Sequence, residues 1–199
     1  MKRISSLLVL FACSIVMSNS LFAAMPVVIV PPPPPGSNSD AHIVNVSIPE
    51  VFIIDVEPKN ATTIALAPTA PTEAGLGLDF SGATNNSLWL NYSSIVENAT
   101  TTRKVTVQIT SGSVPSGVDL KVAAAAAVGG TGTVGTPTGT ITLSNAAQDF
   151  VTGIGSCYTG DGTSKGHNLT YTFALQAGNY NKVYSISTTP ITVTYTITN

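Results

Sequence analysis

A period-two alternation of apolar and hydroxyl-bearing residues constrains this chain more than any other feature. The stretch "KVTVQIT" (104–110) alternates Val105, Val107 and Ile109 with polar residues, and "ITVTYTIT" (191–198) sets four apolar residues against four threonines. Successive side chains of a β-strand point to opposite faces, so each stretch has one face to bury. Both stretches therefore predict strands that are buried on one side.

Further stretches follow the same pattern and are rich in β-branched and aromatic residues. They lie at residues 42–48, 51–56, 87–92, 138–144 and 168–175. The apolar run at 51–56 is nearly unbroken, as if both its faces were covered. The alanine-rich stretch 121–128 has helix propensity, but the glycines that follow it favour a strand. Turn-forming residues separate the runs, at 115–117, 129–130, 135–137, 160–162 and 177–179.

About seven or eight short strands, each with one hydrophobic face, must pack sheet on sheet. We therefore expect an all-β domain with the architecture of a β-sandwich. The composition agrees, since 43% of the 199 residues are hydrophobic and only 9% are charged. The chain has 8 Lys and Arg in total against 10 Asp and Glu, so it carries no excess of positive charge. Without a basic field, nucleic acid is not an expected partner.

The amino terminus has the layout of a secretory signal peptide. Lys2 and Arg3 are followed by an apolar core at 4–16 and a small-residue exit at Ala23–Ala24. The division expected is a signal peptide at 1–24, a proline-rich leader at 25–40 and a single β-sandwich domain at 41–199. The mature protein is then secreted or at the cell surface, passing through the periplasm, and it has no transmembrane span. A rival interpretation treats "LFAC" (10–13) as a lipobox with a lipidated Cys13.

Cysteine usage points to a domain held together by its core. The chain has only Cys13 and Cys157, and cleavage after Ala24 leaves Cys157 alone. No intrachain disulfide can form in that product. A lone thiol of this kind is expected to be buried, because free cysteine behaves as a small hydrophobe.

The closing stretch "AGNYNKVYSISTTPITVTYTIT" (177–198) resembles the ends of secreted pilin-like domains, including those of the spore-coat-U type. The resemblance covers roughly the last 25 residues and the layout of signal, leader and strands. It implies that Gly178, Tyr180 and the strand 191–198 form the last hairpin of an immunoglobulin-like sandwich. The paired cysteines common in such subunits do not occur here.

The resemblance gives the leader a purpose, because pilin-like subunits join when an extended segment of one chain completes the sheet of the next. Pro31 to Pro35 form an extended spacer in front of a flexible joint. One candidate assembly strand is "MPVVIV" (25–30); the other is 42–48, with Val44, Val46 and Ile48 in phase. Alternatively, 42–48 is the first strand of the domain itself.

Catalytic and metal-binding chemistry finds little support. The densest polar cluster, at 153–171, holds Cys157, Asp161, Lys165 and His167, but its glycines are typical of a long hairpin loop. No third residue to orient a Cys–His pair is identifiable. The two histidines lie far apart in sequence, and no spacing suits zinc. We expect no enzyme activity, no cofactor and no metal.

Binding through loops and aromatic side chains remains as a second function. Trp89, Tyr92 and Tyr158 could stack on sugars, with Asp161 and His167 as polar contacts in the same region. Trp89 lies in an apolar strand, which favours a core position. The leading expectation is an exported, non-catalytic subunit of a surface filament or coat, self-associating or joining other surface subunits through strand pairing. The alternative is a monomeric carbohydrate-binding or adhesive module.

Overall fold

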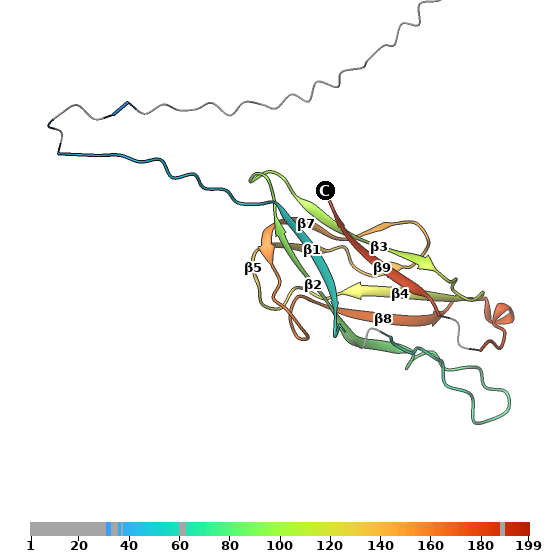
Figure 1. The fold of residues 1–199 in the computed structure, drawn as a ribbon. Coiled ribbons are helices and arrows are strands. Elements are labelled where there is room, and N and C mark those ends of the chain that lie inside the picture. The colour runs from blue at the N-terminus through green and yellow to red at the C-terminus, as the bar shows by residue number, and fades with distance from the viewer. Residues whose placement is uncertain (1–30, 33–35, 37, 60–62, 188–189) are drawn as a thin grey trace, which may run out of the picture. The chain divides into compact units, whose positions relative to one another are not determined.

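The computed structural model describes residues 31–32, 36, 38–59, 63–187 and 190–199 (Figure 1). The chain divides into two units, Met1–Val46 and Ser47–Asn199. In the first unit the described residues are exposed and contain no strand. The predicted signal peptide, the "LFAC" motif and the 25–30 segment lie outside the described residues.

The described residues of the second unit form nine β-strands, which confirms the prediction of an all-β fold. The strands are β1 (Val51–Glu57), β2 (Thr84–Ile95), β3 (Arg103–Ser111), β4 (Val118–Ala124), β5 (Thr131–Pro137), β6 (Ile141–Thr142), β7 (Gln148–Tyr158), β8 (His167–Leu175) and β9 (Thr192–Thr198). The described residues hold no α-helix, only a 3-10 turn at Tyr180–Lys182. They accordingly include no helix long and apolar enough to cross a membrane.

All nine strands belong to one antiparallel hydrogen-bonded sheet. Within it, β2 lies between the strands β8, β4 and β6 on one side and the strands β7, β3 and β9 on the other. The order is β6-β4-β8-β2-β7-β3-β9, while β1 pairs with β2 and β5 pairs with β7. The first half of β2 pairs with β8, its second half pairs with β1, and Ser93 and Ser94 pair with β7. β2 thus connects β1, β8 and β4 to the strands around β7.

The sheet curls so that distant strands face each other across the core. The hydroxyls of Tyr171 on β8 and Tyr195 on β9 lie 2.8 Å apart, although three strands separate β8 from β9 in the sheet order. Val107 and Val122 are completely buried, and Val193 packs partly buried against the same core. The alternate aliphatic positions therefore face inward as predicted. This packing is consistent with a β-sandwich.

Two segments predicted as turn or loop are strands instead. Gly135–Pro137 belongs to β5, and residues 153–158 belong to β7, which lies inside the sheet. The period of two is interrupted in β7, because Phe150 and Val151 are both fully buried and the strand is bulged against β3. Gly153, with φ of 72°, adds a backbone conformation that alternation does not reveal.

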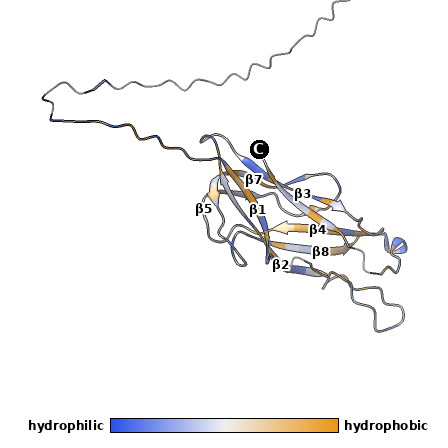
Figure 2. Ribbon diagram, in the orientation of Figure 1, coloured by the Kyte–Doolittle hydropathy of each residue, from blue (hydrophilic) through white to orange (hydrophobic). Residues whose placement is uncertain are grey.

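The first strand also differs from the prediction. Residues 42–48 are not the first strand of the domain, because they are exposed and unpaired and the sheet begins with β1. Nor is β1 covered on both faces: Phe52 is 57% exposed and Ile53 is 66% exposed. Figure 2 shows β1 as a hydrophobic ribbon over most of its length. A hydrophobic strand with an open face is a feature that function has to explain.

Candidate functional site

The structure separates the five predicted ligand contacts into three groups: buried, exposed and partly buried. Tyr92 and His167 are buried. Contrary to the prediction, neither side chain is available to a ligand. Tyr158 is 54% exposed, and Asp161 is exposed beside it in the loop that follows β7. Trp89 is partly buried in β2. Only Tyr158 and Asp161 therefore remain as accessible partners in one place.

Tyr92 and His167 form a polar pair inside the domain. The Tyr92 hydroxyl lies 2.8 Å from Nε2 of His167, whose Nδ1 lies 2.8 Å from the Ala125 carbonyl oxygen. Burial lowers the pKa of His167 below its ordinary value, so the imidazole is neutral. Nδ1–H then donates to the Ala125 carbonyl, and the unprotonated Nε2 faces the Tyr92 hydroxyl. The pair fixes β2 to β8 and the segment after β4.

Cys157 lies on β7 and is buried, as predicted. Burial raises the pKa of its thiol. A nucleophilic cysteine requires the opposite, since the thiolate is the reactive form. Cys157 is therefore a packing residue. Among the described residues, no group of three or more His, Cys, Asp or Glu is placed to hold a metal ion.

A shallow hollow of about 400 Å³ lies where β1, β2 and the loop after β7 meet. Its lining includes Ile53, Asp55, Asn91, Ser93, Tyr158 and Asp161. Asn91 is only 4% exposed, and its Nδ2 donates to the carbonyl of Gly162 at 2.9 Å. Its Oδ1 is buried without a hydrogen-bond partner. The hollow thus combines hydrophobic side chains with hydrogen-bonding groups.

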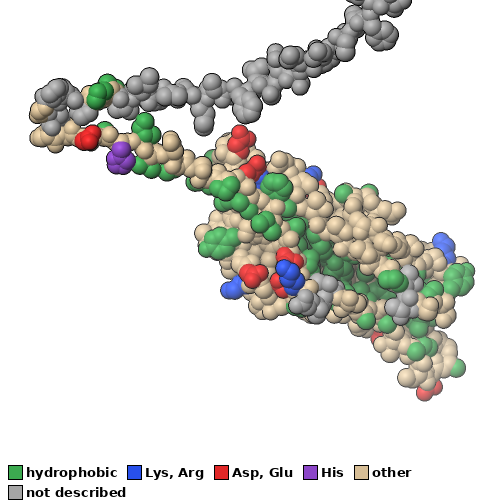
Figure 3. All heavy atoms as spheres, viewed as in Figure 1, with side chains coloured by type: hydrophobic (Ala, Val, Ile, Leu, Met, Phe, Trp, Pro, Cys, Tyr) green, Lys and Arg blue, Asp and Glu red, His purple; other side chains and the backbone are tan. Residues whose placement is uncertain are grey.

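A second feature is formed by two strands that are each paired on one side. Among the described residues, β1 pairs only with β2, and β9 pairs only with β3. Ile54 and Val56 on β1, with Val193 and Tyr195 on β9, are partly buried against the core. In Figure 3, hydrophobic side chains gather in a recess on the face where Figure 1 places β1 and β9. Two free backbone edges therefore adjoin incompletely covered apolar side chains.

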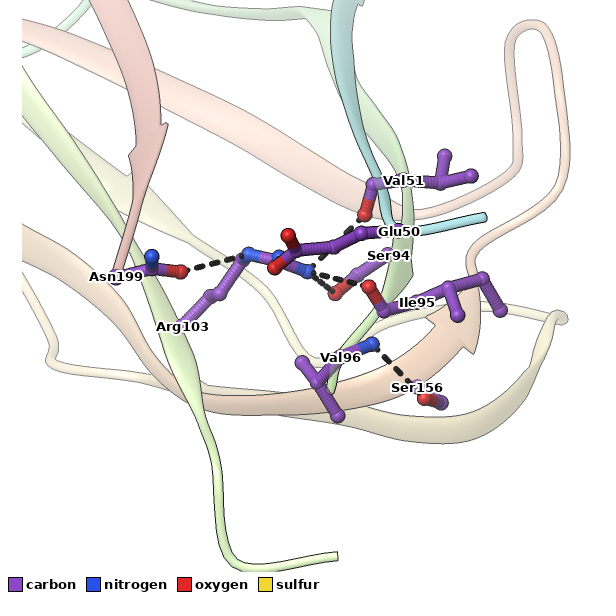
Figure 4. A network of polar contacts seen from close by, with 8 residues as sticks. All are labelled: Glu50, Val51, Ser94, Ile95, Val96, Arg103, Ser156 and Asn199. Atoms are coloured by element: carbon purple, nitrogen blue, oxygen red, sulfur yellow. Dashed lines mark hydrogen bonds and ion pairs between the residues drawn. The ribbon is translucent and has the colours of Figure 1, made fainter. Parts of the chain in front are cut away.

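Arg103 is a buried cation that the sequence analysis did not identify (Figure 4). Its NH1 donates at 3.0 Å to the Val51 carbonyl, Ser94 Oγ and the Ile95 carbonyl. Its Nε donates to Asn199 Oδ1 at 3.0 Å, and its NH2 pairs with Glu50. This Arg103 network joins the start of β1, the end of β2, the start of β3 and the residue after β9.

The sequence did contain a signal for the Arg103 network. Arg103 stands two residues before Val105 and four before Val107, so the alternation of β3 directs it inward with them. An arginine at an inward position requires acceptors, because burial of an unpaired charge is costly. The acceptors come from segments far apart in sequence, which no local pattern could have named.

Comparison with protein-family models finds no match for this chain. Comparisons with curated proteins and with solved structures find none either.

Proposed function

We propose that this protein is an exported, non-catalytic structural subunit of a surface filament or coat, with an immunoglobulin-like domain of the pilin-like kind. Residues 42–48 of one copy, the donor segment, add as a strand to the free edges of β1 and β9 in the next copy. The observation that carries the proposal is the presence of two singly paired strands beside an open part of the core. The signal-like amino terminus supports export.

The donor segment has the pattern that an added strand needs. Val44, Val46 and Ile48 are 70%, 89% and 84% exposed and alternate with Asn45 and Ser47. In an extended conformation the three apolar side chains lie on one face. Main-chain hydrogen bonds supply affinity in strand addition, and pockets for alternate side chains supply register. Burying each of the three aliphatic side chains contributes about 1.5–2 kcal/mol before ordering costs.

The donor segment cannot reach β1 of its own chain by a tight hairpin. Only Pro49 and Glu50 separate Ile48 from Val51. Two-residue hairpin turns require positive φ at one or both central residues. Proline is locked near φ of −65°, and Glu50 is held by Arg103. Pairing with a second copy avoids this turn.

The Arg103 network supports the proposal from the other side. Glu50 and Val51, where the chain enters β1, are both bound to Arg103. Arg103 also binds Asn199, the residue after β9. The base of the donor segment is thereby fixed to a rigid part of the sheet, so force along an assembly would pass into the fold.

Analytical ultracentrifugation of the full chain tests the proposal. A triple variant with Asp at Val44, Val46 and Ile48 places charges at the three apolar donor positions. The matched control places Asp at Asn45 and Ser47, on the opposite face of the same segment. We expect concentration-dependent oligomers for the wild type and the control, and monomers for the triple variant. Monomeric wild type at high concentration, or equal association of both variants, would refute the assembly.

A further inference from the structure

We propose that the hollow between β1, β2 and the loop after β7 is a binding site for a neutral saccharide. The hollow lies mainly over outward-facing residues of β1 and β2, whereas the recess of the strand-addition surface opens onto inward-facing ones; Ile54 borders both. The six lining residues that carry the argument are Ile53, Asp55, Asn91, Ser93, Tyr158 and Asp161.

The floor of the hollow comes from register. Ile53 pairs with Ser93 and Asp55 pairs with Asn91 across β1 and β2. Cross-strand partners share a face of the sheet, so these four side chains form one continuous patch. Ile54 and Val56 point the other way and pack against the core. The patch thus joins one aliphatic side chain to a hydroxyl, an amide and a carboxylate.

The wall of the hollow is a loop held firmly on β2. Thr159 is fully buried, and its Oγ1 accepts from the Tyr92 backbone N–H at 2.9 Å while its own N–H donates to the Tyr92 carbonyl at 3.0 Å. Asn91 Nδ2 binds the Gly162 carbonyl further along the loop. Tyr158 and Asp161 are therefore positioned before any ligand arrives, which lowers the entropy cost of binding.

The chemistry of the lining suits a pyranose. The exposed ring of Tyr158 and the side chain of Ile53, 54% and 66% exposed, provide an apolar surface for the C–H face of a sugar. Ser93 and Asp161 provide hydroxyl and carboxylate groups that bond sugar hydroxyls. A volume of about 400 Å³ falls within the range of small-molecule sites, roughly 300–1,000 Å³.

Charge selects against acidic ligands. The lining contains Asp55 and Asp161 and no Lys or Arg. Lys59 pairs with Asp55, with Nζ and Oδ2 3.8 Å apart, and the lysine side chain is largely exposed. The other oxygen of Asp55 accepts the Val56 backbone N–H at 2.8 Å. The Oδ1 of Asn91, which has no partner, lies under the same surface. A neutral polyol matches this set.

Titration of ¹⁵N-labelled full chain with methyl glycosides of glucose, galactose, mannose and N-acetylglucosamine tests the site by NMR. We expect saturable millimolar shifts with at least one sugar, centred on Ser93, Tyr158 and Asp161. Tyr158→Ala and Asp161→Asn should each weaken that binding by about tenfold or more. Tyr184→Ala removes another exposed tyrosine outside the hollow and should leave binding unchanged.

Three results would overturn the saccharide site. The first is the absence of shifts with all four sugars. The second is binding that Tyr158→Ala leaves intact. The third is binding that requires Ca²⁺ and disappears with EDTA, since the site is argued without a cation. None of these results bears on the oligomeric state, so failure here is distinguishable from failure of the assembly.

Discussion

The rings of Tyr92 and His167 stack in the interior of the domain, with centroids 5.6 Å apart and planes inclined by 21°. The Tyr92 hydroxyl also contacts the Val134 carbonyl on β5. The one proton of that hydroxyl is donated to the Val134 carbonyl, and the hydroxyl oxygen lies 2.8 Å from Nε2 of His167. The pair therefore connects β2, β5 and β8 through a polar cluster in the interior of the domain.

Stability should fall as the pH drops below 6.5. The folded state lowers the pKa of His167 from 6.5 because burial disfavours the imidazolium. In the unfolded chain, His167 therefore takes up a proton first, and the folded state loses stability between pH 6.5 and the lower folded pKa. The slope cannot exceed about 1.4 kcal/mol per pH unit for one group. Urea unfolding measures this: the free energy of unfolding should change less between pH 7.5 and 5.0 for His167→Phe than for the wild type. An equal change in both proteins would contradict the prediction.

Removal of the Tyr92 hydroxyl should be costly. Tyr92→Phe leaves the buried Val134 carbonyl without its donor and removes the polar partner of His167 Nε2, so we expect a loss of about 1–3 kcal/mol in the free energy of unfolding. Tyr180→Phe is the matched control, because that hydroxyl accepts the Leu78 N–H at 3.1 Å in an exposed position. Chemical denaturation of both variants measures the difference. A loss for Tyr92→Phe no larger than the control's would argue against the buried cluster.

Arg103→Met should destabilise the domain by about 3 kcal/mol. The substitution removes the donor to two backbone carbonyls, those of Val51 and Ile95, and to the side chains of Ser94 and Asn199. Lys104→Met, next in sequence, breaks a surface pair with Asp149 whose atoms lie 2.7 Å apart. That control should cost less than about 1 kcal/mol. Thermal and denaturant unfolding would show the contrast, and equal losses would mean that the Arg103 network is not structural.

Gly132→Ala should harm folding far more than Gly162→Ala. Both glycines have positive φ, 91° and 88°, so the intrinsic strain of alanine is similar. A Cβ on Gly132 would overlap the Ser156 carbonyl on β7, whereas Gly162 has open space around it. We expect a difference of about 2 kcal/mol or more between the two variants. Similar unfolding midpoints would show that β5 does not lie this close to β7.

Local patterns predicted the elements that have one clean buried face and missed those that do not. In β3 and β9, Val107 and Val193 follow strict alternation, and both face the core. In β7, Phe150 and Val151 are buried together because the strand is bulged. β5 carries glycines where it approaches β7 closely. Such close approach depends on a partner distant in sequence, so composition alone suggested a turn.

The candidate site was predictable to the same limited extent. Tyr158 and Asp161 were identified from exposed-loop chemistry, and the structure places both at one hollow. Tyr92 and His167 were also candidates by side-chain type, but both are buried, because Tyr92 lies at an inward-facing position of β2 and His167 begins β8. Asp55 and Asn91 came together only through the register of β1 and β2. Register between strands separated by a long segment is set by tertiary packing.

Photo-cross-linking tests the strand-addition account most directly. A p-benzoyl-phenylalanine at position 46, in place of Val46, is irradiated in a mixture of ¹⁵N-labelled and unlabelled protein, and the joined peptides are identified by mass spectrometry. The account predicts mixed-isotope products that link position 46 to residues 51–57 or 192–198 of another copy, with fewer products from a probe at position 45. Products within one chain only, or equal yields from both positions, would contradict it.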